Sequence, residues 1–499
     1  MNRKWWTLVV VSIATFMLLL DITIVNVALP AIERDLHANF ADLQWVIDAY
    51  ALTLAAMLLT GGSLADIMGR RLIFVIGIGI FTVASLLCAL AGTPNVLNFS
   101  RALQGIGGAF MFSTALALLA SAYQGRDRGT AFGVWGAVTG ASVAVGPLVG
   151  GVLTDGIGWE AIFLVNLPVG ILAIALALTQ VEESHAPSGA RIDWPGLVTF
   201  SGALFALIFA LIRGNPEGWD SSLILICLAA AAVLFVAFVL VERSSDHPML
   251  DLTLFRKPAF DGASIAAFAL SASMFSMFLY LTLYIQNILG YTPLESGLRF
   301  LPVTLLSFIV APISGKFAER VGIRWFMGGG LACVGVGLLL MRGLQPGDDW
   351  TALLAGFLIA GAGIGLVNPP LATAAVGVVE PQRAGMASGI NSTFRQVGIA
   401  TGIAGLGAIF QHVVAQNLLE GAAGRLPRGV SGTDAADFVS FGGFRALHNA
   451  ALTRLAEQSF VDGLNDILLV AAIVAFAGAI LAAVLTRPGD FYDHAAPAA

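Results

Sequence analysis

The 499-residue sequence contains few charged residues, since Asp, Glu, Lys and Arg make up only 11% of it. A soluble domain carries roughly 25% of these residues, so the composition excludes an ordinary soluble protein. No Gly-rich loop ends in Gly-Lys-Ser/Thr, which excludes an ATP-driven motor within this chain. No Cys/His cluster has metal-ligand spacing and no Ser/His/Asp set stands out. We therefore expect no enzyme, no cofactor, no metal and no nucleic-acid partner.

Cysteine is also scarce. The three cysteines, Cys88, Cys227 and Cys333, each fall inside an apolar run. This placement favours small core residues over a disulfide set or a metal site.

Apolar residues are abundant, at 58% of the chain, and the mean hydropathy is +0.87. A membrane-spanning helix needs about 20 apolar residues, and such runs fill most of the sequence. Because lipid satisfies no backbone N–H or C=O group, the sequence predicts an all-α polytopic membrane protein. The basic and apolar start lacks a small-residue cleavage site, so we read it as an uncleaved first helix. We predict fourteen spans, at about 7–29, 45–64, 72–91, 97–121, 129–153, 161–180, 195–213, 221–241, 260–286, 297–315, 325–342, 351–376, 384–412 and 463–486.

The distribution of Lys and Arg predicts the orientation of these spans. The short loops on one side hold only Arg34, Arg213, Arg299 and Arg342, whereas the other set holds most of the remaining basic residues. We expect the basic side and both termini in the cytoplasm, and the protein in the inner (cytoplasmic) membrane. The long loop at about 413–462 is then external, and Phe444 to Gln458 is expected as a short helix over the outer mouth.

A short charged segment between two apolar runs occurs twice. Gly62 to Arg71 and Gly315 to Arg324 share a Gly, then an acid, then a second Gly and a basic residue. The matching residues are 253 positions apart; they are Asp66 and Glu319, Gly69 and Gly322, and Arg71 and Arg324. A repeat at fixed offset indicates a duplicated fold.

Glycines further along the chain extend the duplication at an offset of 256, for example Gly105 with Gly361 and Gly129 with Gly385. The sequence predicts two parallel six-helix bundles with an inserted helix pair, and a transport site between the bundles near mid-membrane. The expected parts are an N-terminal bundle at 1–185, the inserted pair at 186–257 and a C-terminal bundle at 258–499.

Two acidic residues lie inside predicted spans. A charge at mid-membrane costs at least ~2.5–3.5 kcal/mol, so Asp21 in the first span must face a cavity or a partner. Because burial favours the protonated form of a carboxyl group, we favour a proton or cation site over a structural carboxylate. Asp48 lies about one turn into the second span. It fits a second acidic site, or equally a side chain that reaches the interface or caps the helix.

Arg101 lies in the outer third of the fourth span and needs an anionic or carbonyl partner. A nearby Asp21 or Asp48 would hold this charge, and protonation of that carboxylate would release it. Such a pair would act as a proton-coupled switch. An Arg101 that only links neighbouring helices explains the sequence equally well.

Polar residues in the thirteenth span share one helix face, at Ser388, Asn391, Ser392 and Arg395. We expect this stripe to face the central cavity, with interhelical hydrogen bonding as the alternative. Asn368, before two prolines, is expected to break the twelfth span and to free carbonyl groups. Tyr284 is a candidate for an apolar substrate pocket, although plain packing also explains it.

Two further patterns point to conformational roles. The fifth span is rich in small residues, including Gly140, Gly146, Pro147 and Gly150, which predicts a closely packed, bendable seam between the halves. The repeated charged segments predict a latch, in which a carboxylate lies beside the positive N-terminus of another helix and holds the inner side shut. Its expected members are Asp66, Gly69, Arg70, Arg71, Glu319 and Arg324, with solvated loop charge as the alternative.

At these motifs the sequence resembles the major facilitator superfamily, and more closely its 14-helix drug:proton antiporter family. The first charged segment resembles that superfamily's loop signature, with Ile67 where a basic residue is common. Leu20 to Pro30 resembles the helix 1 motif of the 14-helix family, and Arg101 to Gly105 the helix 4 motif, whose Arg is assigned to proton coupling.

The resemblance continues along the chain. Gly140 to Gly151 resembles the helix 5 antiporter motif, and Gly158 to Pro168 the helix 6 motif, with Glu160 where Arg is usual. The resemblance implies a major facilitator fold with fourteen helices and export of amphipathic, often cationic compounds against inward proton flow. A dedicated exporter of one lipid, peptide or antibiotic, or more remotely a non-transporting receptor, remains an alternative, and an outer-membrane partner is left open.

Overall fold

The structure is a computed structural model that describes residues 3–38, 40–123, 126–184, 192–245, 248–380, 383–421, 439 and 450–487. Within them the chain forms helices α1 (Arg3–Leu36), α2 (Phe40–Met68), α3 (Arg70–Ala89), α4 (Pro94–Ala122), α5 (Arg126–Gly156), α6 (Ala161–Leu164), α7 (Asn166–Gln180), α8 (Trp194–Glu217), α9 (Ser222–Ser244), α10 (Pro258–Leu270), α11 (Ser276–Leu283), α12 (Pro293–Arg299), α13 (Leu301–Val321), α14 (Ile323–Leu340), α15 (Leu354–Gly377), α16 (Ala384–Gly421) and α18 (Ala450–Leu485). Short 3₁₀ turns occupy η1 (Leu252–Arg256) and η4 (Trp350–Leu353), and π-helical turns occupy η2 (Ser271–Phe275) and η3 (Tyr284–Ile288).

Thirteen of the described helical segments are long and apolar enough to cross a membrane. The 31-residue α5 is a further long helix between α4 and α6. Each of the fourteen predicted spans therefore overlaps a helix, the regular structure of the described residues is entirely helical, and the protein is a multi-pass membrane protein.

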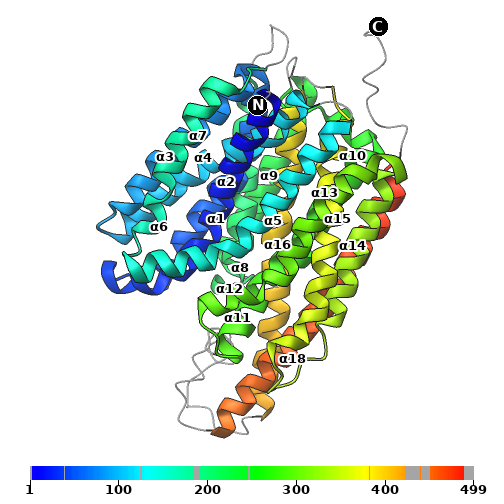
Figure 1. Ribbon diagram of the computed structural model, residues 1–499. Coiled ribbons are helices and arrows are strands. Elements are labelled where there is room, and N and C mark those ends of the chain that lie inside the picture. The colour runs from blue at the N-terminus through cyan, green and yellow to red at the C-terminus, as the bar shows by residue number, and fades with distance from the viewer. Residues whose placement is uncertain are drawn as a thin grey trace.

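The helices form two groups that lie close together at the end holding the first turn of α1 and the last turn of α18, and diverge toward the other end (Figure 1). Helices α1–α7 make one group and α10–α18 the other. At the start of α3 and of α14, Gly69 and Gly322 have φ of 117° and 114°, which L side chains rarely adopt. The same left-handed turn thus recurs at the predicted offset of the duplication.

The two groups meet through glycine contacts near the end that holds the termini. A Cβ on Gly62 of α2 would overlap the backbone carbonyl of Gly385 in α16, and one on Gly129 of α5 would overlap Gly315 in α13. Gly62 and Gly315 occupy equivalent repeat positions, as do Gly385 and Gly129. Two symmetry-related crossings, α2 with α16 and α5 with α13, therefore close this end of the bundle.

Of the inserted pair, α8 packs against α2 and α16, and α9 packs against α8. The hydroxyl groups of Thr60 in α2 and Ser201 in α8 lie 3.0 Å apart. Phe200 and Phe238 join the two inserted helices, with ring centroids 4.9 Å apart. The pair is therefore attached to both groups at the crossing of α2 and α16.

The predicted external loop at 413–462 is wrong at both of its ends. Residues 413–421 continue α16, and residues 450–462 are the first turns of α18. Val414, Leu418 and Phe460 are buried at helical spacing, because the two helices pack on each other there. The predicted short helix over the mouth is part of α18 from residue 450 onward, and its first residues lie outside the described ones.

The predicted break at Asn368 is also wrong, since α15 runs unbroken through Pro369 and Pro370. A proline removes one helical N–H donor and leaves the carbonyl four residues earlier without its bond. For Pro370 this carbonyl belongs to Leu366, and Ser314 Oγ of α13 donates to it over 2.8 Å. A hydroxyl group from the neighbouring helix thus replaces the missing donor.

Only the first part of the glycine-rich seam predicted in α5 contacts the other group of helices. Gly146 and Gly150 pack against Thr23 and Ile24 of α1, which belongs to the same group of helices. Contacts with the other group are made by Gly129, by Gly133, where a Cβ would lie 2.9 Å from the Cα of Pro312, and by Gly136. Gly140 and Pro147 belong to α5, but their surroundings lie outside the described part of the structure.

We expect Gly315→Val to open the crossing of α5 and α13, because the new side chain would overlap the backbone of Gly129. Overpacking of this kind costs about 1–3 kcal/mol. Spin labels at the adjoining ends of α5 and α13, in a background without the three native cysteines, should report a longer distance.

The matched control is Gly79→Val in α3, where a Cβ meets nothing within 4 Å. It should leave the distance between the labels unchanged. An unchanged distance in Gly315→Val would contradict a close-packed crossing.

Candidate functional site

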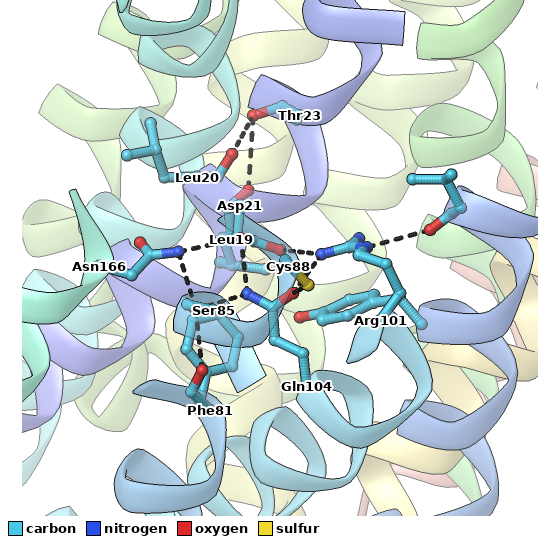
Figure 2. A network of polar contacts seen from close by, with 12 residues as sticks. Leu19, Leu20, Asp21, Thr23, Phe81, Ser85, Cys88, Arg101, Gln104 and Asn166 are labelled. Atoms are coloured by element: carbon cyan, nitrogen blue, oxygen red, sulfur yellow. Dashed lines mark hydrogen bonds and ion pairs between the residues drawn. The ribbon is translucent and has the colours of Figure 1, made fainter. Parts of the chain in front are cut away.

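Asp21 of α1 lies at the centre of a buried polar network within the first group of helices (Figure 2). Its Oδ2 accepts a hydrogen bond of 2.5 Å from Arg101 Nη1 of α4. Its Oδ1 accepts from Gln104 Nε2 at 2.9 Å and from Asn166 Nδ2 at 3.0 Å. One carboxylate therefore joins α1 to α4 and to the start of α7.

A serine and a cysteine of α3 complete the network. Ser85 Oγ accepts from Gln104 Nε2 at 2.8 Å and from Asn166 Nδ2 at 3.3 Å, and donates to the carbonyl of Phe81. Cys88 Sγ lies 3.7 Å from Gln104 Oε1. The two amide side chains are thereby oriented with their nitrogen atoms toward Asp21.

Arg101 is fixed by more than its carboxylate partner. Its Nε donates to the carbonyl of Val46 at 3.0 Å, and its Nη1 also donates to Gln104 Oε1 at 2.6 Å. The guanidinium carbon lies 4.3 Å from the ring centroid of Tyr50, within range of a cation–π contact. Val46 and Tyr50 belong to α2, so Arg101 links α4 to α2 while Asp21 links it to α1.

The side chains of Asp21 and Arg101 are 0% and 2% exposed, so both charges are out of water. Removing one member of a buried pair leaves an uncompensated charge, which typically costs about 3–5 kcal/mol. Protonation of Asp21 would remove the same attraction without a mutation. The arrangement can therefore convert proton binding into a weaker link between α1 and α4.

Asp48 does not join this network. It lies on α2 with its Oδ2 atom buried and without a hydrogen-bond partner among the described residues. The charge that acts on it is Arg213 of the inserted helix α8, whose Nη1 donates to Gln44 Oε1 at 2.8 Å. Of the two acids predicted as partners of Arg101, only Asp21 is one, and Asp48 faces the inserted pair.

The second group of helices holds a buried cluster around Arg395 of α16, which is 6% exposed. Its Nη2 donates to Asn368 Oδ1 of α15 at 3.1 Å, and its Nε lies 3.5 Å from Asn391 Oδ1. None of the described ion pairs includes Arg395. The amide nitrogens of Asn368 and Asn391 and the hydroxyl group of Ser388 are buried without partners in the described structure.

This cluster is rich in donors and carries a positive charge with no described counter-ion. Gly136 of α5 packs against Asn368, where a Cβ would lie 3.4 Å from the Asn368 Cβ. The cluster therefore borders the first group of helices. Its unused donors suit an oxygen acceptor such as a carboxylate, phenolate or carbonyl group.

Tyr284 is not part of either polar group. It is 1% exposed and belongs to the hydrophobic core of the second group of helices, at the start of η3. The structure therefore gives it a packing position rather than a position beside Arg395 or Asp21.

The carboxylate contact predicted for the latch is present in the first copy of the repeat. Asp66 Oδ1 accepts from Arg70 Nη2 at 2.8 Å and from the backbone N–H of Gly385 at 3.0 Å. Its Oδ2 accepts from the backbone N–H of Met386 at 2.8 Å. The carboxylate thus caps the positive N-terminus of α16 from the other group of helices.

The other predicted latch residues have different surroundings. Arg71 bonds to the segment after α7, with its backbone N–H donating to Glu183 Oε1 at 2.9 Å. Arg324 lies 4.8 Å from the ring of Trp325. The side chain of Glu319 lies outside the described residues, so the second carboxylate latch stays a prediction.

Sequence reasoning missed Gln104 and Asn166, which are 0% and 2% exposed and bind Asp21. Gln104 was detectable, since it lies three residues after Arg101 and shares its helix face. Asn166 was not, because it lies 145 residues from Asp21 and only the packing of α7 brings it near.

Comparison with known proteins agrees with this architecture. The sequence profile of the Major Facilitator Superfamily matches residues 11–403. The chain is 36% identical over 495 residues to the multidrug resistance protein Stp of Mycobacterium tuberculosis, covering 96% of this chain and 92% of Stp. It is 33% identical to the tetracenomycin C resistance and export protein of Streptomyces glaucescens, covering 99% and 94% of the two chains.

A solved structure shares the fold. The human organic anion transporter MFSD10 superposes with a TM-score of 0.62 over 95% of this chain and 100% of that chain, at 14% sequence identity. This likeness concerns the arrangement of helices alone.

We expect Asp21→Asn and Arg101→Gln each to lower the free energy of unfolding by about 3–5 kcal/mol, because each leaves one buried charge unpaired. The double variant should cost less than the sum of the two, by about 0.5–3 kcal/mol. Equilibrium unfolding in mixed detergent micelles measures all three values.

The control is the pair of Arg3 and Glu182, whose side chains are 67% and 71% exposed. Breaking an exposed pair should cost only about 0–1 kcal/mol. Additive effects of the Asp21 and Arg101 substitutions would rule out a coupled pair.

Proposed function

Because this chain belongs to the Major Facilitator Superfamily, we propose that it exports amphipathic drugs or other toxic compounds in exchange for protons. Relatives that match nearly the whole chain are named as a multidrug resistance protein and as a resistance and export protein. The observation that carries proton coupling is the buried ion pair of Asp21 and Arg101. No cofactor is needed, since the proton gradient supplies the energy.

In this proposal the proton binds Asp21. The carboxylate is held by one guanidinium and two amide groups, so protonation removes a charge that three donors compensate. Arg101 keeps its bonds to Val46 and Gln104 after the ion pair is lost. Proton binding therefore loosens α1 from α4 without freeing the arginine, and Asp48 is a candidate for a second proton.

Substrate recognition is expected between the two groups of helices. Asp21 offers negative charge on one side, so a cationic substrate competes with the proton and with Arg101 for it. Arg395, Asn391 and Asn368 offer donors on the other side. An amphipathic molecule with both a basic group and an oxygen acceptor fits both ends, whereas Tyr284 contributes to the apolar core.

Alternating access then follows from movement of α1–α7 against α10–α18. The end that holds the termini is closed by the glycine crossings and by Asp66 on α16, and we propose that this end faces the cytoplasm of a cell with the protein in its inner membrane. The distribution of Lys and Arg supports this orientation. Opening this end requires the Asp66 cap to leave α16.

A dedicated exporter of one lipid, peptide or antibiotic is the second candidate. A relative named for tetracenomycin C resistance and export favours it. The two candidates share fold and coupling and differ in breadth of substrate. We do not favour a non-transporting receptor, because that function gives no reason for a buried ion pair between helices.

In proteoliposomes, we expect an imposed pH gradient to drive ethidium across the membrane in the wild type and to fail in Asp21→Asn, because the variant cannot bind the proton at this site. Ethidium fluorescence follows the movement. Gln104→Glu is a useful companion, since it adds a carboxylate beside Asp21 and should shift the pH dependence of transport.

Undiminished, gradient-driven movement in Asp21→Asn would move the coupling role to Asp48. Absence of movement of any cationic dye in the wild type would favour the dedicated exporter. The exposed Glu182→Gln variant serves as the control and should transport like the wild type.

We expect Arg395→Gln to impair the transport of acidic substrates selectively, because the substitution removes the positive charge that would bind an oxygen acceptor. The probes are a rhodamine methyl ester and the corresponding free acid. The KM for the acid should rise about tenfold, the loss of one charge-assisted hydrogen bond, with little change for the ester. Lys316→Gln, an exposed cation in the same group of helices, is the control, and equal effects on both dyes would refute the assignment.

A further inference from the structure

Two buried carboxyl groups lie at the end of the inserted helix pair nearest the Asp66 latch. Asp193 precedes α8, and its Oδ1 accepts from the backbone N–H of Gly196 at 2.8 Å. Glu242 lies near the end of α9, and its Oε2 accepts from the backbone N–H of Leu250 at 3.2 Å. The residues are 9% and 4% exposed.

The other oxygen atom of each carboxyl group is buried without a hydrogen-bond partner in the described structure; these atoms are Asp193 Oδ2 and Glu242 Oε1. Both border the same small space, since they lie 2.9 and 2.8 Å from the point that a Cβ on Gly196 would occupy. Each carboxyl group thus has one oxygen that accepts a backbone hydrogen bond and one unpartnered oxygen at this shared space.

The charged side chains described around this pair either bind other groups or are exposed. Arg243 of α9 is exposed, and Lys257 donates to the carbonyl of Val378 at 2.8 Å. Asp251 pairs with Arg383, and Asp66 of α2 pairs with Arg70. None of the described ion pairs includes Asp193 or Glu242.

Two ionised carboxylates that border one buried space repel each other, and one shared proton would remove the repulsion by letting one group donate to the other. A metal ion would do the same, but it requires further ligands. Among the described residues, no group of three or more His, Cys, Asp or Glu side chains is placed to hold one. The geometry therefore favours a proton as the occupant.

The pair also holds a segment that touches the latch. Residues 249–251, which we call the strap, are bound to Glu242 through the Leu250 N–H. Ser63 Oγ of α2 donates to the carbonyl of Met249 at 3.4 Å, and the N–H of Asp251 donates to Met386 Sδ of α16 at 3.5 Å. Met386 is one of the two residues whose N–H groups bind Asp66.

The other side chain that holds the strap is Asp251, and it keeps its charge over the neutral pH range. Burial by itself raises the pKa of Asp251, but hydrogen bonds from Thr253 and the ion pair with Arg383 outweigh it and hold the pKa below its usual value. Asp251 is therefore ionised at neutral pH. Any change of the strap in this range must come from another group.

We propose that Asp193 and Glu242 form a proton-binding carboxyl pair that fastens the strap to the crossing of α2 and α16. With the proton shared, Glu242 stays in place and holds Leu250. When the proton leaves, the two charges repel, and the strap is released from the latch. Rising pH on this side thus loosens the crossing. The site is separate from Asp21 and Arg101, so it does not rest on the proposed function.

Infrared difference spectroscopy tests the shared proton on the purified full-length protein. The wild type should show a protonated carboxyl band that disappears as pH rises. The same band should be missing in Asp193→Asn and in Glu242→Gln, because either change leaves a single carboxyl group with an amide partner. A band that persists in both variants, or its absence from the wild type, would overturn the pair.

Hydrogen–deuterium exchange tests the strap. After correction for the intrinsic pH dependence, exchange at residues 249–251 should rise about tenfold in the wild type as the pair ionises, since a local opening equilibrium shifts by that factor. Asp193→Asn should remove this pH dependence. Asp220→Asn, at an exposed acid in the connection between α8 and α9, should keep it. Equal pH dependence in Asp193→Asn and the wild type would refute control of the strap by the pair.

Discussion

The structure depends on one constraint, which is that a charge within the lipid-spanning part must find its partners inside the protein. Asp21 meets it with a guanidinium and two amide groups, and Arg101 meets it with Asp21, a carbonyl group and an aromatic face. These bonds come from α1, α2, α4 and α7, so the network also fixes how the first group of helices packs. In our proposal, a proton bound to Asp21 would alter this balance.

The duplicated fold is not duplicated in its polar chemistry. The first group of helices compensates its buried arginine with a carboxylate, whereas Arg395 in the second group has only amide oxygens among its described partners. One side is thus suited to protons and cations and the other to oxygen acceptors. Under the proposed function, a substrate that contacts both sides would meet charges of opposite sign.

The closed end of the bundle combines steric and electrostatic contacts. Glycine at both crossings lets the backbones touch, and Asp66 adds a carboxylate on the N-terminus of α16. The inserted helices reach the same place through residues 249–251. The inserted helix pair has no counterpart in the repeat, but through these residues it touches the place where the two groups of helices meet. Asp193 and Glu242 lie beside this contact.

Hydropathy, the fixed-offset repeat and helical periodicity predicted from sequence alone that the chain is a multi-pass membrane protein with fourteen long helices, that it is duplicated, and that Asp21 and Arg101 need partners. These features depend on local composition and spacing. Only the tertiary structure decided that Arg101 pairs with Asp21 and not with Asp48, that Asn166 joins them, and that Gly146 faces α1 instead of the other half. Periodicity gives the depth and face of a residue, but the rotation of each helix against its neighbours depends on packing across distant segments. For the same reason Asp193 and Glu242, unremarkable in sequence, became a pair only when α8 and α9 were brought together.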